Sequence, residues 1–317
     1  DQLPSLSNEQ LATLGSAQLA ALSESQLNSL SSSQFQALTS RQIGFLSAAQ
    51  VVALESEDLA ALTATQMRGL STAALAAMDT SDLALLGSHQ LAALTTTQLR
   101  ALEPADLAGL STEAVMALGS QQIAALTSGQ LAGLTDAQWQ SLGQSQLRGL
   151  GTAQLASLGT EDLNILTSDQ FQMLGSAQIA ALGTHQVASL ESEDLGALTS
   201  TQLRGLESRD VAALDSADLA SLGAAQWAAL GSAQLRAIST EALAGLGTDV
   251  LPTLGTAQIA QLSTAQIAAL GSEQLLAMTS SQLRALGSAQ LQALASDDLN
   301  ALTTAQFAAL TSTQLGS

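Results

Sequence analysis

An eight-residue phrase repeats along the chain without a break, and this repeat restricts the possible folds more than any other feature. Starting at Ser7, the sequence divides into octads whose positions we label a to h, as in GSAQLAAL at residues 15–22. The register holds to Leu310 without an insertion or deletion, which gives 304/8 = 38 complete octads. Position h is Leu in nearly all of them, position e is always apolar, and position d is Gln in 26. A fixed short period of this kind indicates a repeat architecture.

Two of the structures with an eight-residue period do not fit the pattern. A continuous α-helix turns by about 100° per residue, so each octad would rotate the apolar stripe by about 80° and no face would stay buried. A β-solenoid requires alternating apolar residues and favours β-branched ones, whereas positions e and h are three residues apart and Ala, Leu and Gln dominate. Both alternatives are therefore disfavoured.

One short helix in every octad fits better. Position a is usually Ser, Thr, Gly or Asp, and Gln usually follows three residues later, which is the capping-box pattern of a helix start. Pro104 falls at b, the first helical position, where proline is tolerated. Pro4 and Pro252 fall at f and argue against a long helix through the octads. A Gly at position a also suits the left-handed conformation that ends the preceding helix.

Such short helices need neighbours, because a helix of about six residues is too short to persist alone. We therefore predict an all-α solenoid, a superhelix of very short capped helices with one helix per octad. Positions e, h and part of g should lie inside, and positions b, c and f should lie outside. We expect residues 1–317 to form a single continuous body without internal domain boundaries, with 38 full octads over residues 7–310.

A longer repeat, with a period of about 136 residues or 17 octads, overlies the short one. The stretch ESEDLAALTATQMRGL at residues 55–70 returns as ESEDLGALTSTQLRGL at residues 191–206. Duplication of a gene segment explains this period most simply. A structural explanation is that 17 octads complete a whole number of superhelical turns. Acidic d positions recur three octads apart, at Asp58, Asp82 and Asp106; if five turns fill 17 octads, one turn takes about 27 residues.

Composition excludes several classes of partner and chemistry. The chain has eight basic residues, all Arg, against 27 acidic residues, and its net charge of −19 disfavours nucleic acid and anionic membrane surfaces. It has no Cys, which excludes disulfides and thiolate chemistry. No apolar run is long enough for a membrane span and no signal peptide is visible. Because the chain begins at Asp1 without Met, we expect a processed product or an excised fragment.

The residues that could carry chemistry all have simpler structural explanations. His89 and His185 both fall at position c and lack a second His or Cys at ligand spacing, so we expect solvated surface side chains. The clusters ESED at residues 55–58 and 191–194 should cap helices, with weak divalent-cation binding as the alternative. Trp139 and Trp227 fall at e and should fill the core. We predict no catalytic, cofactor-binding or metal-binding residue, no cofactor, and no enzymatic activity.

The octad pattern [ST]-x-x-Q-[LIV]-x-[AS]-L, clear in GTAQIAQLSTAQIAALGSEQLLAM at residues 255–278, resembles a repeat of very large secreted or surface-exposed, adhesin-like proteins of Gram-negative bacteria. The resemblance covers essentially the whole chain. It implies export without a cleaved signal, anchoring at the cell surface and an extracellular location. The calcium-binding nonapeptides that often accompany such proteins are absent from this sequence.

Together these observations predict a non-catalytic extracellular structural protein, a rod, spacer or fibre-forming segment of a bacterial surface, adhesin or matrix protein. The alternative is a repeat scaffold whose groove or outer face binds a protein or a glycan. Substitutions at b, c and f are mostly Ala, Ser and Thr, which favours the spacer. Both ends of the chain stop inside an octad, so we expect self-association end to end or contact with neighbouring repeats of a longer chain. We expect no membrane insertion and no small-molecule substrate. Ice or mineral binding by outward Ser and Thr rows is disfavoured because those hydroxyls cap helices.

Overall fold

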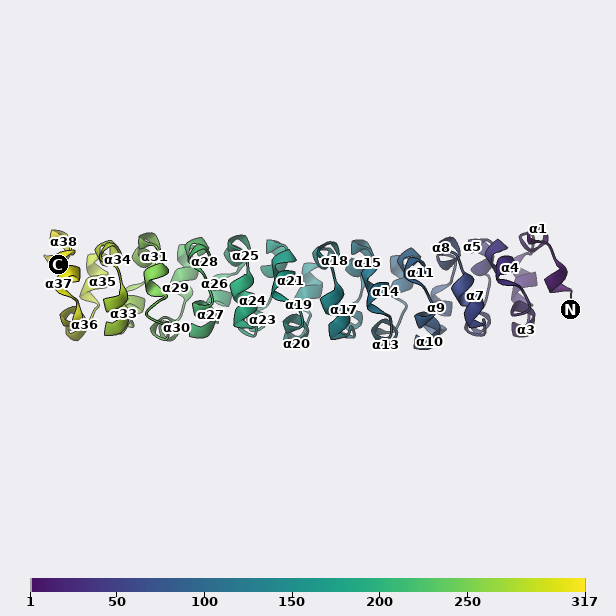
Figure 1. Cartoon of the computed structure of the whole chain (residues 1–317), viewed down its shortest axis with the longest axis horizontal. Helices are drawn as coiled ribbons and strands as arrows, with labels where there is room; N and C mark the ends of the chain where they lie inside the picture. Colours follow the sequence, from purple (N-terminus) through teal and green to yellow (C-terminus); the bar gives the residue numbers. More distant parts are fainter. Residues whose placement is uncertain (1, 317) are drawn as a thin grey trace. The chain divides into compact units, whose positions relative to one another are not determined.

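The structure, a computed structural model, describes residues 2–316 of the chain. Its contacts divide the chain into two compact units, Asp1–Leu158 and Gly159–Ser317. Within the described residues every regular element is helical and no strand occurs. Each unit by itself is an all-α solenoid of short helices, as the octad pattern predicts (Figure 1). A single continuous body over residues 1–317 stays a prediction.

The first unit contains one short 3₁₀-helix, η1 (Leu3–Ser5), and nineteen α-helices within its described residues. These are α1 (Asn8–Leu11), α2 (Ser16–Ala20), α3 (Glu24–Leu27), α4 (Ser32–Ala37), α5 (Ser40–Ile43), α6 (Ala48–Val52), α7 (Ser56–Ala61), α8 (Ala64–Met67), α9 (Thr72–Ala77), α10 (Thr80–Ala84), α11 (Ser88–Ala93), α12 (Thr96–Leu99), α13 (Pro104–Ala108), α14 (Thr112–Met116), α15 (Ser120–Ala125), α16 (Ser128–Ala132), α17 (Asp136–Ser141), α18 (Gln144–Gly149) and α19 (Thr152–Ala156).

The second unit likewise contains one 3₁₀-helix, η2 (Leu251–Thr253), and nineteen α-helices within its described residues. These are α20 (Thr160–Asn164), α21 (Ser168–Met173), α22 (Ser176–Ile179), α23 (Thr184–Ala188), α24 (Ser192–Ala197), α25 (Ser200–Gly205), α26 (Ser208–Val211), α27 (Ser216–Ala220), α28 (Ala224–Ala229), α29 (Ser232–Ala237), α30 (Thr240–Ala244), α31 (Thr256–Gln261), α32 (Thr264–Ala268), α33 (Ser272–Ala277), α34 (Ser280–Ala285), α35 (Ser288–Gln292), α36 (Ser296–Ala301), α37 (Thr304–Ala308) and α38 (Ser312–Leu315).

Every one of these α-helices begins at position b of its octad, and position a is its N-cap. In α5 the hydroxyl of Thr39 accepts the backbone N–H of Gln42 at 3.3 Å, while the Gln42 side-chain oxygen accepts the N–H of Thr39 at 2.9 Å. This reciprocal pair is the predicted capping box, and it satisfies two N–H groups that the helix leaves without intrahelical partners. Pro104 is the first residue of α13, which confirms its predicted place.

The prolines at position f mark the places where an octad lacks an α-helix. Pro4 lies in η1 and Pro252 lies in η2, so the octad at residues 247–254 forms only a turn and a 3₁₀-helix. Proline removes a backbone donor and clashes with the preceding turn of an α-helix. The octad register continues unchanged into α31, so the interruption stays local.

The prediction that Gly at position a adopts a left-handed conformation is wrong. No residue in the described chain has a positive φ. Gly143, the N-cap of α18, has φ −85° and ψ 170°, and Leu142 before it has φ −66° and ψ 126°. Consecutive helices are thus joined by two extended residues, h and a. A left-handed cap would normally satisfy the last carbonyls of a helix, but here side chains from the next turn of the solenoid do so, as described below.

The core consists mainly of the side chains at e and h, with a few g residues such as Ala93 and Ala229 also buried, as predicted. Trp139 and Leu147 at position e are fully buried, and Leu142 and Leu150 at position h are 2% and 3% exposed. Helices pack on the helix three octads along the chain, for example α15 on α18 in the first unit and α22 on α25 in the second. Hydrogen bonds between successive turns span sequence separations of 25 to 31. The predicted turn of about 27 residues falls within this span.

A glycine at position g marks a close approach between stacked helices. A Cβ atom at Gly149, at the end of α18, would lie 2.6 Å from the carbonyl oxygen of Ser120, the first residue of α15. Gly69 meets the backbone of Ser40 in the same way and at the same sequence separation. A Cβ atom at the glycines of position a would meet either open space, as at Gly143, or side-chain atoms of the same octad, and no backbone atom of a stacked helix. Glycine is therefore required by the stacking of helices, not by the turn between octads.

Candidate functional site

The glutamine at position d is the polar group that recurs most often, and its side chain lies inside the solenoid. Gln98 is 3% exposed. Its Oε1 accepts the N–H of Thr95 at 2.8 Å, and its Nε2 donates to the carbonyl oxygens of Met67 and Leu70, both at 2.8 Å. Met67 is the last residue of α8, and Leu70 lies three residues after it, outside the helix. One glutamine therefore caps the start of its own helix and the end of a helix one turn earlier.

The same bridge to the carbonyls 31 and 28 residues earlier recurs throughout each unit, with distances of 2.6 to 3.5 Å. In the first unit it is made by Gln42, Gln50, Gln66, Gln90, Gln98, Gln122, Gln130, Gln138, Gln146 and Gln154. In the second it is made by Gln202, Gln226, Gln234, Gln266, Gln274, Gln282, Gln290, Gln306 and Gln314. We call this series the glutamine ladder.

The sequence carries a signal for the glutamine ladder that the capping-box interpretation does not use. A capping box accepts either Glu or Gln at its last position, yet Glu occurs at none of the d positions of this chain. Glu offers an acceptor for the N-cap amide but no donor for a carbonyl. The preference for Gln over Glu therefore reflects the second bridge, which ties one turn to the previous one.

Where Asp replaces Gln at d, a different bridge joins the turns. Asp194 accepts a hydrogen bond of 2.6 Å from the Ser168 hydroxyl, and Asp210 accepts one of 2.7 Å from Thr184. Both donors lie at position b three octads earlier. An ionised carboxylate is only an acceptor, so it pairs with a hydroxyl instead of a carbonyl. The same pair occurs in Thr80–Asp106, Ser192–Asp218 and Ser272–Asp298.

Long polar side chains at position f also bind the next turn. The Nε of Arg100 donates to the carbonyl oxygen of Ala125 at 2.6 Å, 25 residues later. The amide of Asn28 donates to the carbonyl of Ala53 at 2.8 Å. Other examples are Arg68–Ala93, Asn164–Ser189, Arg236–Gln261 and Arg284–Ala309. These side chains hold the stack together at the outer surface.

The acidic clusters lie at helix starts as predicted, with Glu55 and Glu191 as the N-cap residues and Asp58 and Asp194 in the first turns, but the two N-cap side chains make no capping hydrogen bond. Neither Glu55 before α7 nor Glu191 before α24 accepts a hydrogen bond from a helix amide. Asp58 and Asp194 are instead buried, at 5% and 4% exposure, because position d points into the stack. Burial raises the pKa of Asp58 to about 6, with the charges of Glu55 and Glu57 as further causes of the rise.

In the second cluster the pKa of the corresponding aspartate, Asp194, is raised as well. Burial raises the pKa of Asp194 above its usual range, against the hydrogen bond from Ser168, which lowers it. The charges of Glu191 and Glu193 add to the rise. Among the described residues no three His, Cys, Asp or Glu side chains are placed so that they could hold a metal ion.

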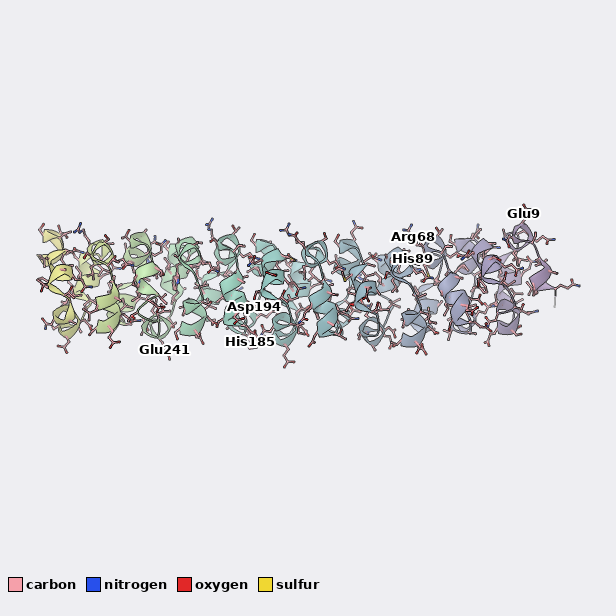
Figure 2. All side chains as sticks on the ribbon, in the orientation of Figure 1. Glu9, Arg68, His89, His185, Asp194 and Glu241 are labelled. Carbon is pink, nitrogen blue, oxygen red and sulfur yellow. The ribbon has the colours of Figure 1, made fainter. Side chains whose placement is uncertain are left out.

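The remaining residues singled out from the sequence lie where the octad register predicts. His89 and His185 are exposed, whereas Asp194 is buried; Figure 2 labels all three residues. Trp139 and Trp227 are fully buried. Two shallow grooves that share Thr96 and Gln121 lie beside Arg68 and Arg100. Over residues 2–316 no helix has the length and apolar character that crossing a membrane requires.

A comparison of the sequence with known protein families finds a repeat family over the region that the octads occupy. The sequence profile of the ALTTAQ repeat matches most of the chain. The matched stretches are residues 11–48, 51–84, 75–105, 99–136, 140–176, 187–224, 211–248, 243–280 and 276–312. No curated protein matches the chain.

Proposed function

Because the chain belongs to the ALTTAQ repeat family, we propose that it is a non-catalytic structural segment that acts as a spacer in a bacterial surface, adhesin or matrix protein. The spacer lies outside the cell and holds other parts of its protein at a distance. It uses no cofactor and acts on no small-molecule substrate. It binds neither nucleic acid nor membrane.

The observation that carries this proposal is the glutamine ladder. Most octads contribute the same kind of cap and the same buried e and h side chains, and the glutamine octads add the same bridge to the previous turn. The side-chain amides of these glutamines are thus engaged in holding one turn to the next. In a solenoid stability is roughly a sum of such neighbouring contacts, so the chain can lengthen without a new core. This property suits a spacer.

The surface supports the same proposal. Positions b, c and f carry mainly Ala, Ser and Thr, and distinctive residues such as His89 and His185 stand singly. A binding site usually needs a concave pocket with a few convergent polar groups. The lack of Cys and Lys and the charge of −19 are compatible with export and with a surface that repels other copies laterally.

Two experiments test the proposal. Antibodies against the chain should label intact cells of the source bacterium, and added protease should remove that label. Labelling only after the cells are lysed would contradict the extracellular role.

The second experiment measures length by small-angle X-ray scattering. Variants in which residues 137–272 are deleted, or present twice, change the chain by one long repeat of 17 octads. Stacked helices lie about 9 Å apart, so five turns should change the maximum dimension by about 45 Å. A compact particle whose dimension does not follow the number of repeats would contradict the spacer.

The alternative, a scaffold that binds a protein or a glycan, is favoured by one observation. The two grooves beside Arg68 and Arg100 combine guanidinium, hydroxyl and amide groups along one stretch of surface. A glycan array probed with the purified chain separates the two functions. If the chain is a spacer, it should bind no glycan on the array. Binding to a glycan by the wild-type chain that the Arg100→Gln variant loses would support the alternative.

A further inference from the structure

The charged side chains of the first unit are separated by sign around the solenoid. With about 27 residues to a turn, each octad advances by about 8/27 of a turn, or about 106°. Arg100 lies four octads after Arg68 and Arg148 lies ten octads after it, so they stand about 65° ahead of Arg68 and about 20° behind it. Arg41, three octads before Arg68, falls between Arg68 and Arg100 by the same rotation. These four exposed arginines form what we call the arginine face of the first unit.

The carboxylates of the first unit lie on the other side. Their octads stand about 170° to 275° past Arg68 by the same rotation. In Figure 1 the helices at three of the arginines, α5, α8 and α18, follow one edge of the unit, and α3, α10 and α13 follow the opposite edge. Among the described residues of this unit Glu9 alone breaks the separation, on the same edge as Arg68 in Figure 2. The acidic face of the first unit consists of the exposed or half-buried residues Glu24, Glu55, Glu57, Asp79, Asp82, Glu103, Glu113 and Asp136.

The second unit carries the same two faces. Its arginine face consists of Arg204, Arg236 and Arg284, each 136 residues after an arginine of the first unit. Arg209 stands between the two faces and pairs with Glu207 at 3.0 Å. Each unit by itself therefore presents positive and negative charge on opposite sides. The acidic face of the second unit consists of Glu161, Asp162, Glu191, Glu193, Asp215, Glu241, Asp249, Glu273, Asp297 and Asp298, with Asp169 at its edge.

The stacking of the octads does not require this separation. At position f the Nε of Arg68 donates to a carbonyl oxygen of the next turn, that of Ala93, at 3.2 Å. On the acidic side Asn28, also at f, makes the equivalent bond to Ala53 at 2.8 Å without a charge. An arginine at position 28 would in addition attract Glu24, four residues earlier on the same helical face. Because arginine is nevertheless confined to the other side, its charge serves something beyond the stack.

The stacking bond leaves the guanidinium groups ready for a partner. Four arginines of the two arginine faces use Nε for the bond to the next turn: Arg68, Arg100, Arg236 and Arg284. Within residues 2–316 their Nη atoms donate to no group, and none of the four pairs with a carboxylate. A guanidinium that is held at Nε keeps two Nη groups that can bind both oxygens of one carboxylate. Each arginine face therefore offers a row of exposed carboxylate-binding groups.

From this arrangement we propose that copies of the chain lie side by side, with the arginine face of one copy against the acidic face of the next. The carboxylates of the acidic face recur every three or four octads, about once per turn, so each arginine of the partner meets one. A single ion pair at a surface contributes little, and the contact therefore depends on several that form together along the face. Each copy keeps one free face of each kind, so the assembly grows sideways into a sheet.

The net charge selects this orientation. Each copy carries −19, which repels copies in other lateral orientations and most of all when two acidic faces meet. Only the arginine face against the acidic face brings opposite charges into contact. The contact goes beyond the proposed spacer, because it holds neighbouring spacers together along their length.

Sedimentation velocity of the whole chain over a range of concentrations tests the contact. Salt of about 0.1 M screens charges that are more than about 10 Å apart and leaves those in contact to act. Arg68→Gln/Arg204→Gln removes one charge from each arginine face. The introduced glutamine can keep the bond to the next turn, as Gln36 at position f does with Ala61 at 3.2 Å. Circular dichroism checks that each variant keeps its helices.

Two further variants separate the faces from the net charge. The control Gly129→Glu/Ala265→Glu has the same net charge as the arginine variant, −19 − 2 = −21, but changes exposed positions between the faces. Glu57→Arg/Glu193→Arg places positive charge on both acidic faces and reduces the net charge to −19 + 4 = −15. Net charge alone would make this last variant associate more tightly than the wild-type chain, whereas opposed faces make it associate more weakly.

We expect the wild-type chain and the control to form concentration-dependent oligomers that dissociate in about 1 M salt. Each face variant should associate about tenfold more weakly than the wild-type chain, since the lost pairs are each worth up to about 1 kcal/mol. An equimolar mixture of the two face variants should recover dimers, because one keeps its acidic face and the other keeps its arginine face.

Three outcomes would overturn the proposal. These are a wild-type chain that is monomeric at every concentration, a control that associates as weakly as Arg68→Gln/Arg204→Gln, and a Glu57→Arg/Glu193→Arg variant that associates more tightly than the wild-type chain. None of them would affect the length measurement that tests the spacer.

Discussion

The side-chain amide of Gln98 donates to the carbonyl oxygen of Met67, 31 residues earlier in the chain, at 2.8 Å. The same side chain accepts the N–H of Thr95 at the start of its own helix. A helix of four to six residues has nearly all of its backbone groups at its ends, where intrahelical partners are missing. The bridge from Gln98 explains how such helices can be buried: each end is satisfied by a side chain at a fixed place in the octad.

Replacing Gln98 by Glu should destabilise the first unit. The carboxylate can still accept from Thr95, but it turns a charge toward the carbonyls of Met67 and Leu70 in a buried site. We expect a loss of about 3 kcal/mol at neutral pH. Urea unfolding followed by circular dichroism measures the loss, and hydrogen exchange should show it in α8 and α12.

Acid should rescue the Gln98→Glu variant, because the introduced carboxyl group regains a donor when it is protonated. Gln121→Glu is the control, since it makes the same change at an exposed position in the same unit. If both variants unfold at the same urea concentration, the ladder does not stabilise the stack.

Acidification should stabilise the wild-type chain through Asp58. Its pKa is raised to about 6 from 3.8, so the folded state holds the proton more tightly than the unfolded chain does. The free energy of unfolding therefore falls as the pH rises from about 4 to about 6 and remains lower above that range. Asp194, whose pKa is also raised, acts in the same direction.

Asp58→Asn should flatten this pH dependence, and Asp58→Gln should also raise stability at neutral pH. The introduced glutamine amide would reach the carbonyls of Leu27 and Leu30, which stand in the same register to position 58 as Met67 and Leu70 do to Gln98. The exposed Asp136→Asn serves as the control. Thermal unfolding at about pH 4.5 and pH 7 measures the effect, and an unchanged pH slope in Asp58→Asn would contradict the role of Asp58.

Two glycines within helices should respond to alanine with opposite signs. Gly129 in α16 has open space around it, so Gly129→Ala should stabilise by about 0.5–1 kcal/mol through helix propensity. Gly149→Ala should instead destabilise by about 1–3 kcal/mol, because the new methyl group meets the Ser120 carbonyl. Urea midpoints of the two variants test this, and a gain in both would rule out the close approach of α18 to α15.

The interrupted octad at residues 247–254 should be repairable. The double substitution Val250→Gln/Pro252→Ala places a glutamine at position d and removes the proline, so an α-helix should form in this octad. The side-chain amide of the introduced glutamine should then reach the carbonyls of Leu219 and Leu222. We expect more helix by circular dichroism and a gain of about 1–3 kcal/mol. Pro252→Ala alone is the comparison that separates the proline from the ladder. Unchanged helix content in the double variant would mean that other residues of the octad prevent the helix.

Much of the fold can be predicted from the residues of a single octad and their local chemistry. Thr39 with Gln42 predicts a capped helix start, Pro104 predicts a first helical residue, and apolar e and h predict the buried side. Each of these depends on residues within a single octad. The exposure of His89 and the burial of Trp139 follow from the same register.

The tertiary structure decided the contacts between turns, which join residues at separations of 25 to 31. The stacking brings the Gln98 amide to the carbonyl of Met67 and the Asp194 carboxylate to the hydroxyl of Ser168. It also brings the backbone of Ser120 so close to residue 149 that only a glycine fits there without a shift. The expected left-handed conformation of the glycines is absent. The carbonyls at the helix ends accept hydrogen bonds from side chains of another turn, so they need no left-handed C-cap. Sequence by itself determined the helix, its ends and its apolar face, since these depend on neighbouring residues. The stacking geometry determines which distant groups meet, and no local pattern specifies it.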